Sequence, residues 1–188
     1  MFLKPTNMKK WIIGAVVGGI LTFAWQTLSW TVLDLHRNGQ QYTPKQDTIM
    51  QFLNNQFTES GDFFLPTTPV GASQEEVEKL MESSTGKPWA KVSYHTSWDG
   101  DMTANILRGF LVNIIMVAMM IWILMKMGNP SFSTILISCL FAGLIGFLNF
   151  PYASYIWYQG GGIRADLLDA LLQWGLCGIW LGWWLNRR

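Results

Sequence analysis

An uncharged stretch near the N-terminus constrains this chain more than any other feature. From Trp11 to Leu33 there are 23 consecutive residues without an acidic or basic side chain. A helix needs about 20 predominantly apolar residues to cross the roughly 30 Å hydrocarbon core of a bilayer. Lys9 and Lys10 precede the stretch, as in a signal peptide, but it is long for one and residues 22–24 form a poor cleavage site. We therefore expect a retained transmembrane helix at residues 11–33.

Three further apolar stretches predict three more spanning helices. The chain is half apolar and only 13% charged, whereas about 25% charged residues are usual in soluble domains. Gly128-Asn129-Pro130 separates the second span from the third, and Pro151 is expected to end the third. The expected fold class is membrane all-α, with four transmembrane helices and a small α+β extracytoplasmic domain between helices 1 and 2. The predicted segments are a tail at 1–10, spans at 11–33, 105–125, 132–150 and 163–185, the domain at 34–104, a loop at 151–162 and a tail at 186–188.

The distribution of charge predicts the orientation. Cytoplasmic segments of membrane proteins are enriched in Lys and Arg. With both termini in the cytoplasm, six basic residues would be cytoplasmic and all twelve acids would lie on the other side. The six are Lys4, Lys9, Lys10, Lys126, Arg187 and Arg188. The net charge of +1 provides no clustered basic footprint, so we expect the lipid bilayer, and no nucleic acid, as a partner.

The domain between the first two spans shows a helix, strand, helix, strand pattern. Thr43 is a good N-cap for the first helix. Residues 62–66 are expected to form a short strand, and residues 88–95 an alternating one. Between them, Ser73 and Glu76 predict a capping box that opens the second helix. A unit of this size has a thin core, so it would need the membrane helices or a partner for stability.

Three charged residues near the predicted outer membrane surface form a candidate site. Arg108 lies near the outer end of the second span, and Asp166 and Asp169 lie in the first turns of the fourth. All three are expected at a similar depth, where ionisable residues are candidates for function. We predict a structural ion pair between Arg108 and Asp169. A ligand pocket, or a relay for protons or a substrate, is the alternative.

His36 and His95 are the two histidines of the chain, and acidic residues lie close to both in the sequence. Two histidines and a carboxylate are a common donor set for transition metals. Their spacing matches no metal-binding motif, so ordinary surface histidines are the alternative. Apart from this candidate metal site, no cofactor is predicted.

Three pairs of small residues predict close contacts between helices. Their spacing of four residues allows two helix backbones to approach, either within one bundle or between subunits. Uncharged polar residues within the spans are expected to join helices by hydrogen bonds, among them Gln26, Asn113 and Gln173. The small pairs are Gly14 and Gly18 in the first span, Ala142 and Gly146 in the third, and Gly178 and Gly182 in the fourth.

An aromatic cluster occupies the predicted loop between the third and fourth spans. It consists of Tyr152, Tyr155, Trp157 and Tyr158. Tyrosine and tryptophan at this level usually anchor a protein in the lipid headgroup region. They also dominate the hot spots of protein–protein interfaces. Interfacial anchoring and docking of a partner are both consistent with the cluster.

Sequence motifs of common enzymes are absent from the chain. It contains no GxSxG, HExxH or CxxC, and no GxGxxG followed by an acid. The largely uncharged spans also offer no buried polar catalytic set. We therefore expect a protein without enzyme activity.

Five segments together resemble a family of bacterial inner-membrane proteins with no assigned activity. They are Trp11–Asp34, Gln41-Tyr42-Thr43-Pro44, Phe64-Leu65-Pro66, Gly86-Lys87-Pro88-Trp89-Ala90 and Leu171–Leu185. The likeness covers most of the chain from Met8. It implies a location in the bacterial inner membrane with a periplasmic domain, and it implies nothing about mechanism.

Small-residue helix faces, interfacial aromatics and a thin domain together favour one function. We expect an accessory or assembly subunit of a larger membrane complex, with other membrane-protein subunits as partners. The alternative is a small transporter or ligand-binding membrane protein with a pocket at its periplasmic face, near Arg108, Asp166 and Asp169.

Overall fold

The computed structural model describes the backbone of residues 5–187 and the side chains of residues 8–187. The ends of both expected tails, residues 1–4 and 188, lie outside the described residues. The chain divides into two compact units. We call residues 1–41 and 101–188 the helical unit, and residues 42–100 the small unit.

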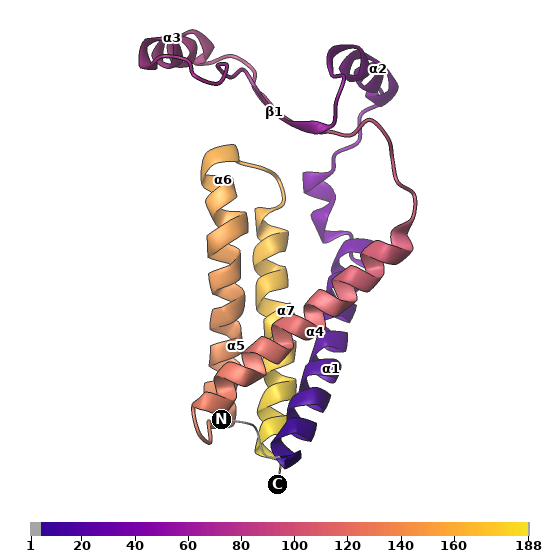
Figure 1. Ribbon diagram of the computed structural model, residues 1–188, viewed down its shortest axis with the longest axis vertical. Helices are drawn as coiled ribbons and strands as arrows, with labels where there is room; N and C mark the ends of the chain where they lie inside the picture. Colours follow the sequence, from indigo (N-terminus) through magenta and orange to yellow (C-terminus); the bar gives the residue numbers. More distant parts are fainter. Residues whose placement is uncertain (1–4, 188) are drawn as a thin grey trace. The chain divides into compact units, whose positions relative to one another are not determined.

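The helical unit consists of four long helices and several short turns (Figure 1). Helix α1 continues into a wider π-helical turn, η1, and a 3-10 turn, η2, follows it. Helix α5 continues through a second π-helical turn, η3, into the short helix α6. The elements are α1 (Pro5–Thr27), η1 (Leu28–Val32), η2 (Leu35–Gly39), α4 (Met102–Lys126), α5 (Phe132–Phe147), η3 (Leu148–Tyr152), α6 (Ala153–Tyr158) and α7 (Ile163–Asn186).

Three helices among the described residues are long and apolar enough to cross a membrane. They are Met8–Val32, Met102–Lys126 and Phe132–Tyr158. Helix α7 has sufficient length, with 24 residues, but its composition is less apolar. Four tryptophans, three glycines and Gln173 lower its hydropathy, and charged residues occupy its first turns. The structure therefore shows a mostly helical protein with three candidate spans, and the fourth span stays a prediction.

Pro151 does not end the third apolar helix, contrary to the sequence prediction. It lies inside η3, and α6 follows directly. Proline lacks a backbone N–H, and its ring collides with the carbonyl group four residues earlier in a regular α-helix. A π-helical turn shifts the hydrogen bonding by one residue and so accommodates the ring. Residues 153–158 of the expected loop are consequently helical.

The glycine pair of α1 is used within this chain. A Cβ atom on Gly14 would lie 2.9 Å from Ile121 Cδ1 of α4, and one on Gly18 would lie 2.7 Å from Val117 Cγ1. Real Cβ atoms do not approach other atoms this closely, so a larger residue at either position would force the facing side chain of α4 to shift. The same two glycines also face the rings of Trp184 and Trp180 of α7. Helix α1 therefore packs against both α4 and α7.

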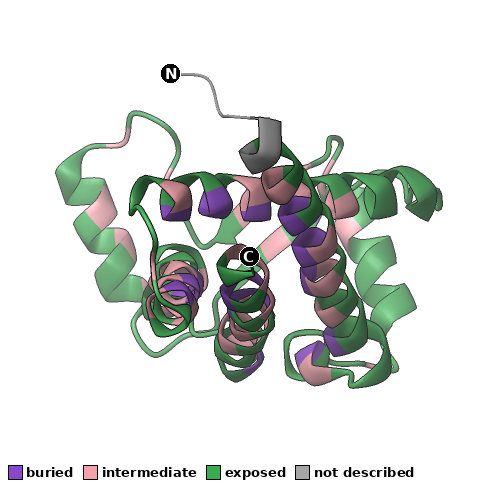
Figure 2. Ribbon diagram, turned by 90° about the horizontal axis from the view of Figure 1, so that it is seen from below, coloured by how far each residue is buried: buried purple, intermediate pink, exposed green. Residues whose placement is uncertain are grey.

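The glycine pair of α7 receives α5. A Cβ atom on Gly182 would lie 2.7 Å from Phe132 Cδ2, and one on Gly178 would lie 3.0 Å from Cys139 Cβ. Gly146, of the third predicted pair, faces open space instead. Figure 2 shows buried residues on the sides of the helices that are turned toward one another. The buried core cluster comprises Ala15, Val117, Met120, Ile121, Leu124, Ile135, Cys139, Cys177 and Leu181.

The small unit has the expected order of helix, strand, helix and strand. Strands β1 and β2 pair antiparallel, with Phe63 opposite Val92. The ring of Phe57 stacks on Phe63 at 3.9 Å, and it lies 5.5 Å from the ring of Tyr94. The Tyr94 hydroxyl donates a hydrogen bond to Asn54 Oδ1 at 2.9 Å. The elements are α2 (Gln46–Gln56), β1 (Gly61–Leu65), α3 (Gln74–Ser84) and β2 (Ala90–Tyr94).

The two predicted helix starts in the small unit have different outcomes. The capping box of Ser73 and Glu76 is confirmed, with both reciprocal hydrogen bonds present. Thr43 is not the N-cap of α2, because Lys45 occupies that position. The Thr43 hydroxyl accepts a hydrogen bond from the Lys45 N–H at 3.3 Å instead, which stabilises a turn before the helix.

Candidate functional site

Asp169, in the second turn of α7, is the centre of a polar cluster in the helical unit. Its Oδ1 accepts hydrogen bonds from the Ser29 hydroxyl at 2.6 Å and from the Trp25 indole N–H at 3.0 Å. Its Oδ2 lies 2.8 Å from His36 Nε2. Three side chains from α1, η1 and η2 therefore converge on one carboxylate of α7. We call Asp169, Ser29, Trp25, His36 and the adjacent Asp166 the Asp169 cluster.

His36 is held on several sides. Its residue is only 7% exposed, and its ring stacks on Trp30 with a centroid distance of 3.9 Å and an interplanar angle of 6°. While Nε2 faces Asp169, Nδ1 lies 3.7 Å from Asp166 Oδ1. The two ring nitrogens of one imidazole thus face two different carboxylates.

A left-handed turn brings His36 to this position. Asp34, between η1 and η2, has φ +49° and ψ +38°, a conformation that Asp and Asn adopt more readily than most residues. Its carboxylate accepts a hydrogen bond from Arg37 Nε at 2.7 Å. The turn ends the line of α1 and η1, so that η2 places His36 against the start of α7. A straight continuation of α1 would carry His36 away from Asp169.

The π-helical turn η1 places Ser29 and Trp30. Ser29 has no exposed surface, and its hydroxyl is directed at Asp169. A π-helical turn inserts an additional residue and rotates the side chains that follow, and such turns are frequent at functional sites. In η1 this rotation allows consecutive residues to serve the same site: Ser29 bonds the carboxylate, and Trp30 covers the imidazole.

The order of groups in the cluster limits its chemistry. In a Ser-His-Asp triad the histidine lies between the nucleophile and the acid. In the Asp169 cluster the carboxylate lies between Ser29 and His36, so no histidine activates the serine. All buried side-chain nitrogen and oxygen atoms of the described residues have hydrogen-bond partners. The arrangement is suited to joining α1, η1 and η2 to the start of α7 by hydrogen bonds.

A second polar group lies along the same helices. Asn113 of α4 is 2% exposed, and its Nδ2 donates to Gln26 Oε1 at 3.1 Å and to the Gly109 carbonyl at 2.9 Å. Gln173 Nε2 donates to Asn113 Oδ1 at 3.1 Å. Gln173 follows Asp169 by one helical turn. We call Gln26, Asn113 and Gln173 the amide triad; as the sequence predicted, its hydrogen bonds join helices, namely α1, α4 and α7.

The structure gives Asp169 different partners from the one expected. Its neighbours are His36, Ser29 and Trp25, whereas Arg108 is exposed on α4 and forms no ion pair among the described residues. The sequence indicated that Arg108 and Asp169 share a depth. It did not show that η2 returns His36 to α7, and an adjacent imidazole at 2.8 Å satisfies Asp169 without Arg108.

The candidate metal site of His36 and His95 is not assembled in the part of the chain that the structure describes. No group of three or more His, Cys, Asp or Glu residues among the described residues could hold a metal ion. His36 belongs to the helical unit and His95 to the small unit. The Asp169 cluster contains one histidine and two carboxylates, but they meet at opposite edges of the imidazole ring rather than at a common point.

The predicted aromatic cluster lies at the end of η3 and along α6. Tyr152 stacks with Tyr155 at a centroid distance of 6.4 Å, and its ring is also 5.9 Å from Phe147. Trp157 is 77% exposed, and Tyr158 is exposed as well. Anchoring in lipid and docking of a partner both stay predictions for these residues.

Sequence reasoning missed Trp25, Ser29 and Trp30 as members of the site. Each belongs to the uncharged first span, where small polar and aromatic side chains are expected to pack against other helices. The spacing of four between Trp25 and Ser29 places both on one helix face, which is the one available signal.

Comparison of the chain with protein-family models, with curated proteins and with solved structures gives no match.

Proposed function

We propose that this chain is a multi-pass membrane protein without enzyme activity, and an accessory or assembly subunit of a larger complex in the bacterial inner membrane. One observation carries the proposal. The small unit exposes large apolar side chains, although it is not one of the apolar helices that could span a membrane. Partner recognition through that surface is the function that accounts for it.

The small unit has almost no interior of its own. Within residues 42–100, all of which are described, Tyr94 is the one buried residue. Exposed apolar side chains that gather into one patch mark sites of protein–protein contact, and aromatic side chains dominate such contacts. The most exposed large apolar residues of the unit are Tyr42 (74%), Phe52 (62%), Val70 (108%), Met81 (67%) and Trp98 (91%).

The charge of the small unit favours a protein partner over a lipid surface. The unit contains eight acidic residues and four lysines. Bacterial membranes carry anionic lipids, and a negative surface potential repels an acidic domain. A protein surface with apolar residues and a basic rim would be complementary to it. The partner we propose is therefore another membrane-complex subunit with a basic, partly apolar face.

The proposed topology has four spans, with α7 as the fourth, both termini cytoplasmic and the small unit periplasmic. Helix α7 has 24 residues, which is about 36 Å at the helical rise. It packs against both α1 and α5, which are themselves apolar enough to span. The positions of Lys10, Lys126 and Arg187 at helix ends support the orientation through the positive-inside rule.

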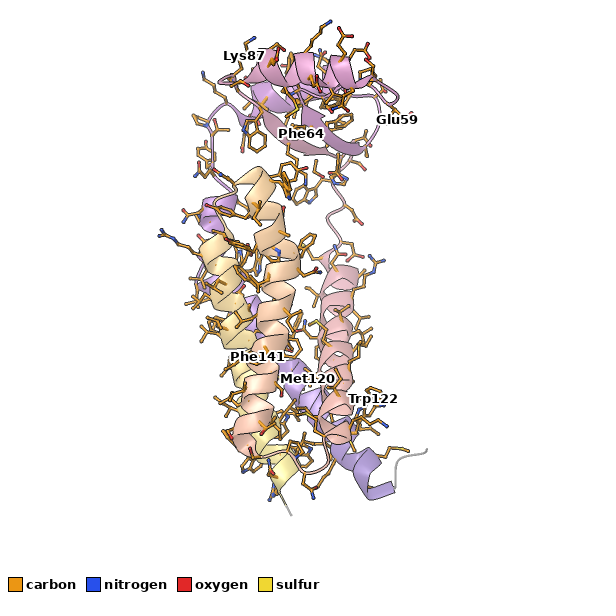
Figure 3. All side chains as sticks on the ribbon, turned by 90° about the vertical axis from the view of Figure 1, so that its left-hand side faces the viewer. Glu59, Phe64, Lys87, Met120, Trp122 and Phe141 are labelled. Atoms are coloured by element: carbon orange, nitrogen blue, oxygen red, sulfur yellow. The ribbon has the colours of Figure 1, made fainter. Side chains whose placement is uncertain are left out.

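Affinity purification from native membranes tests the proposal. Tagged full-length protein would be isolated in a mild detergent, and its companions identified by mass spectrometry. We expect a stoichiometric set of membrane subunits, and we expect the double substitution Phe52→Ser, Trp98→Ser to reduce their recovery about tenfold or more. The matched control is Glu59→Ser, Lys87→Ser, two polar surface residues of the same unit (Figure 3).

Two results would contradict this function. A stable monomer without companions, recovered from native membranes with the wild-type chain, would remove its basis. Equal losses in the apolar and polar double variants would show that recovery depends on the integrity of the unit and not on its apolar surface. Protein abundance in the membrane is measured for each variant, so that a folding defect is separated from a lost contact.

The alternative, a small transporter or ligand-binding protein with a periplasmic pocket, is favoured by a separate observation. The Asp169 cluster and the amide triad lie one helical turn apart on α7, so that polar groups extend from one end of the bundle toward its middle. Asp169→Asn and Asn113→Leu distinguish the two functions. Loss of solute uptake or of growth at normal protein abundance would support transport, whereas reduced abundance alone would show a structural role.

A further inference from the structure

A cavity of about 630 Å³ lies at the end of the helical unit where α1 begins and where α4 and α7 end. Four separate segments line it: the first turns of α1, the last turn of α4, the loop at residues 128–130, and the last residues of α7. The Lys10 ammonium donates a hydrogen bond to the Arg187 carbonyl group. This bond joins the beginning of α1 to the end of α7, two segments that lie near each other in Figure 1.

Among the residues that the structure describes, the charged groups that line the cavity are positive. Lys10 and Arg187 line it, and α1, α4 and the loop at 127–131 contain no acidic residue. The acids of α7 nearest to Arg187 in sequence are Asp166 and Asp169. Asp169 precedes Arg187 by 18 residues, or about 27 Å along a helix, which is well beyond the screening length of about 8 Å in physiological salt.

The lining of the cavity is amphiphilic. The side chains of Asn129 and Asn186 add polar groups to the two cations, while the partly exposed Met125 and Leu185 present hydrocarbon. A lysine ammonium has three donors, and the contact with the Arg187 carbonyl group uses one of them. Among the described residues the Lys10 ammonium makes no other hydrogen bond, which leaves two donors for an anion beside apolar side chains that suit the glycerol and upper acyl region of a lipid.

Aromatic contacts indicate that this end of the bundle suits the membrane interface. The Arg187 guanidinium lies 5.0 Å from the ring centroid of Trp183, and the Lys126 ammonium lies 5.0 Å from that of Trp122. Tryptophan and basic residues are enriched together at the headgroup level of membrane proteins. A cation-lined cavity at the end of apolar helices is thus positioned where lipid phosphates are abundant.

We propose that this cavity binds the phosphate group of an anionic phospholipid, with Lys10 and Arg187 as its cationic contacts. The group that the two cations would bind is an anionic phosphate, and inorganic phosphate presents the same anionic oxygens. The apolar wall is what distinguishes the lipid from the free ion. The site is independent of the small unit and of the partner proposed for it.

The test uses full-length protein purified in a zwitterionic detergent. Thermal unfolding would be followed while short-chain phosphatidylglycerol, phosphatidylcholine of the same chain length, or inorganic phosphate is added. We expect phosphatidylglycerol to raise the unfolding temperature in a saturable manner, and neither phosphatidylcholine nor inorganic phosphate at equal concentration to do so. A shift produced equally by inorganic phosphate would overturn the lipid as ligand, and an equal shift with phosphatidylcholine would overturn phosphate recognition.

Two sets of variants locate the site. Lys10→Gln, Arg187→Gln should weaken the affinity for phosphatidylglycerol about tenfold or more, because each basic residue near an anionic lipid contributes measurably. The control is Lys9→Gln, Lys126→Gln, which removes the same charge from residues of the same helix ends that do not line the cavity. Equal weakening in both sets would show attraction by general charge and would refute the site. Arg187→Gln alone, which leaves the Lys10 contact in place, should weaken binding without lowering the unfolding temperature of the lipid-free protein.

Discussion

The helical unit and the small unit both expose large apolar side chains, yet their interiors are built differently. In the helical unit, backbones approach until only glycine fits: a Cβ atom on Gly143 would lie 2.5 Å from the Ala170 carbonyl oxygen. In the small unit, three aromatic rings hold one face of a two-stranded sheet. Trp122 and Phe141 project from the bundle, 55% and 60% exposed (Figure 3), as lipid-facing residues do.

The exposure of an apolar side chain has a different meaning in the two units, because it depends on the medium that surrounds each unit. An apolar helix surface matches hydrocarbon, and it requires no further partner once the helices pack. An apolar surface on an acidic unit of 59 residues with one buried side chain matches neither water nor an anionic bilayer. Stability in the helical unit should therefore depend on backbone approach, and stability in the small unit on a few contacts and on whatever covers it.

The largest expected effect tests backbone approach in the helical unit. Gly143→Leu should destabilise the protein by about 3 kcal/mol, because the new side chain meets the Ala170 carbonyl and the Trp174 ring. Gly146→Leu, three residues later in α5, is the matched control, since a Cβ atom there meets nothing within 4 Å. Unfolding by a denaturing detergent, followed by circular dichroism, measures both. Similar losses in the two variants would refute close α5–α7 packing as the source of stability.

A slightly smaller effect is expected at the Asp169 cluster. Asp169→Ala should destabilise the helical unit by about 2–3 kcal/mol, because Trp25, Ser29 and His36 would lose their common acceptor. Asp166→Ala should cost less than about 1 kcal/mol, since that side chain is one-third exposed and 3.7 Å from His36. Hydrogen exchange of the amides at residues 35–39 would show the release of η2 in the first variant only. Equal exchange rates in the two variants would show that Asp169 does not hold η2 in place.

In the small unit, Tyr94→Phe should cost about 1 kcal/mol. The substitution removes the hydroxyl that bonds Asn54 and retains the ring that packs near Phe57. Amide exchange in β1 and β2 should accelerate, while exchange in α1, α4 and α7 stays unchanged. Acceleration throughout the chain would show that the two units unfold together and do not have separate sources of stability.

The smallest expected effect is a pH dependence at the start of α3. Hydrogen bonds from the Ser73 backbone N–H and hydroxyl lower the pKa of Glu76 below its ordinary value of 4.5. A lowered pKa means that the carboxylate stabilises the fold above pH 4.5, and that this contribution is lost as the pH falls through the lower, folded-state pKa. Amide exchange at the start of α3 should therefore accelerate in acid, and Glu76→Gln should remove that dependence. Glu59→Gln, in the same unit, should leave it intact.

The helices, the strands and one helix cap could be predicted from the sequence, because each depends on residues close together in the chain. The capping box at Ser73 depends on residues three apart, and the order of helix, strand, helix and strand depends on short-range periodicity. The apolar helices were visible as uncharged runs, since a bilayer demands length and composition rather than particular contacts. Glycine pairs four residues apart likewise predicted close helix packing, but they did not indicate which helix would pack against them.

Contacts between residues far apart in the sequence could not be predicted, because they depend on the path of the backbone. The Asp169 cluster joins residues 133 to 144 positions apart, and it depends on a left-handed residue at Asp34 and on the π-helical turn η1. Neither feature could be predicted from the local sequence, because the apolar residues around it favour a regular helix. The same holds for Pro151, where a π-helical turn permits a residue that ordinarily ends a helix. Pairing between distant charges is settled by the path of the backbone between them, and a single turn was sufficient to give Asp169 to His36 and leave Arg108 exposed.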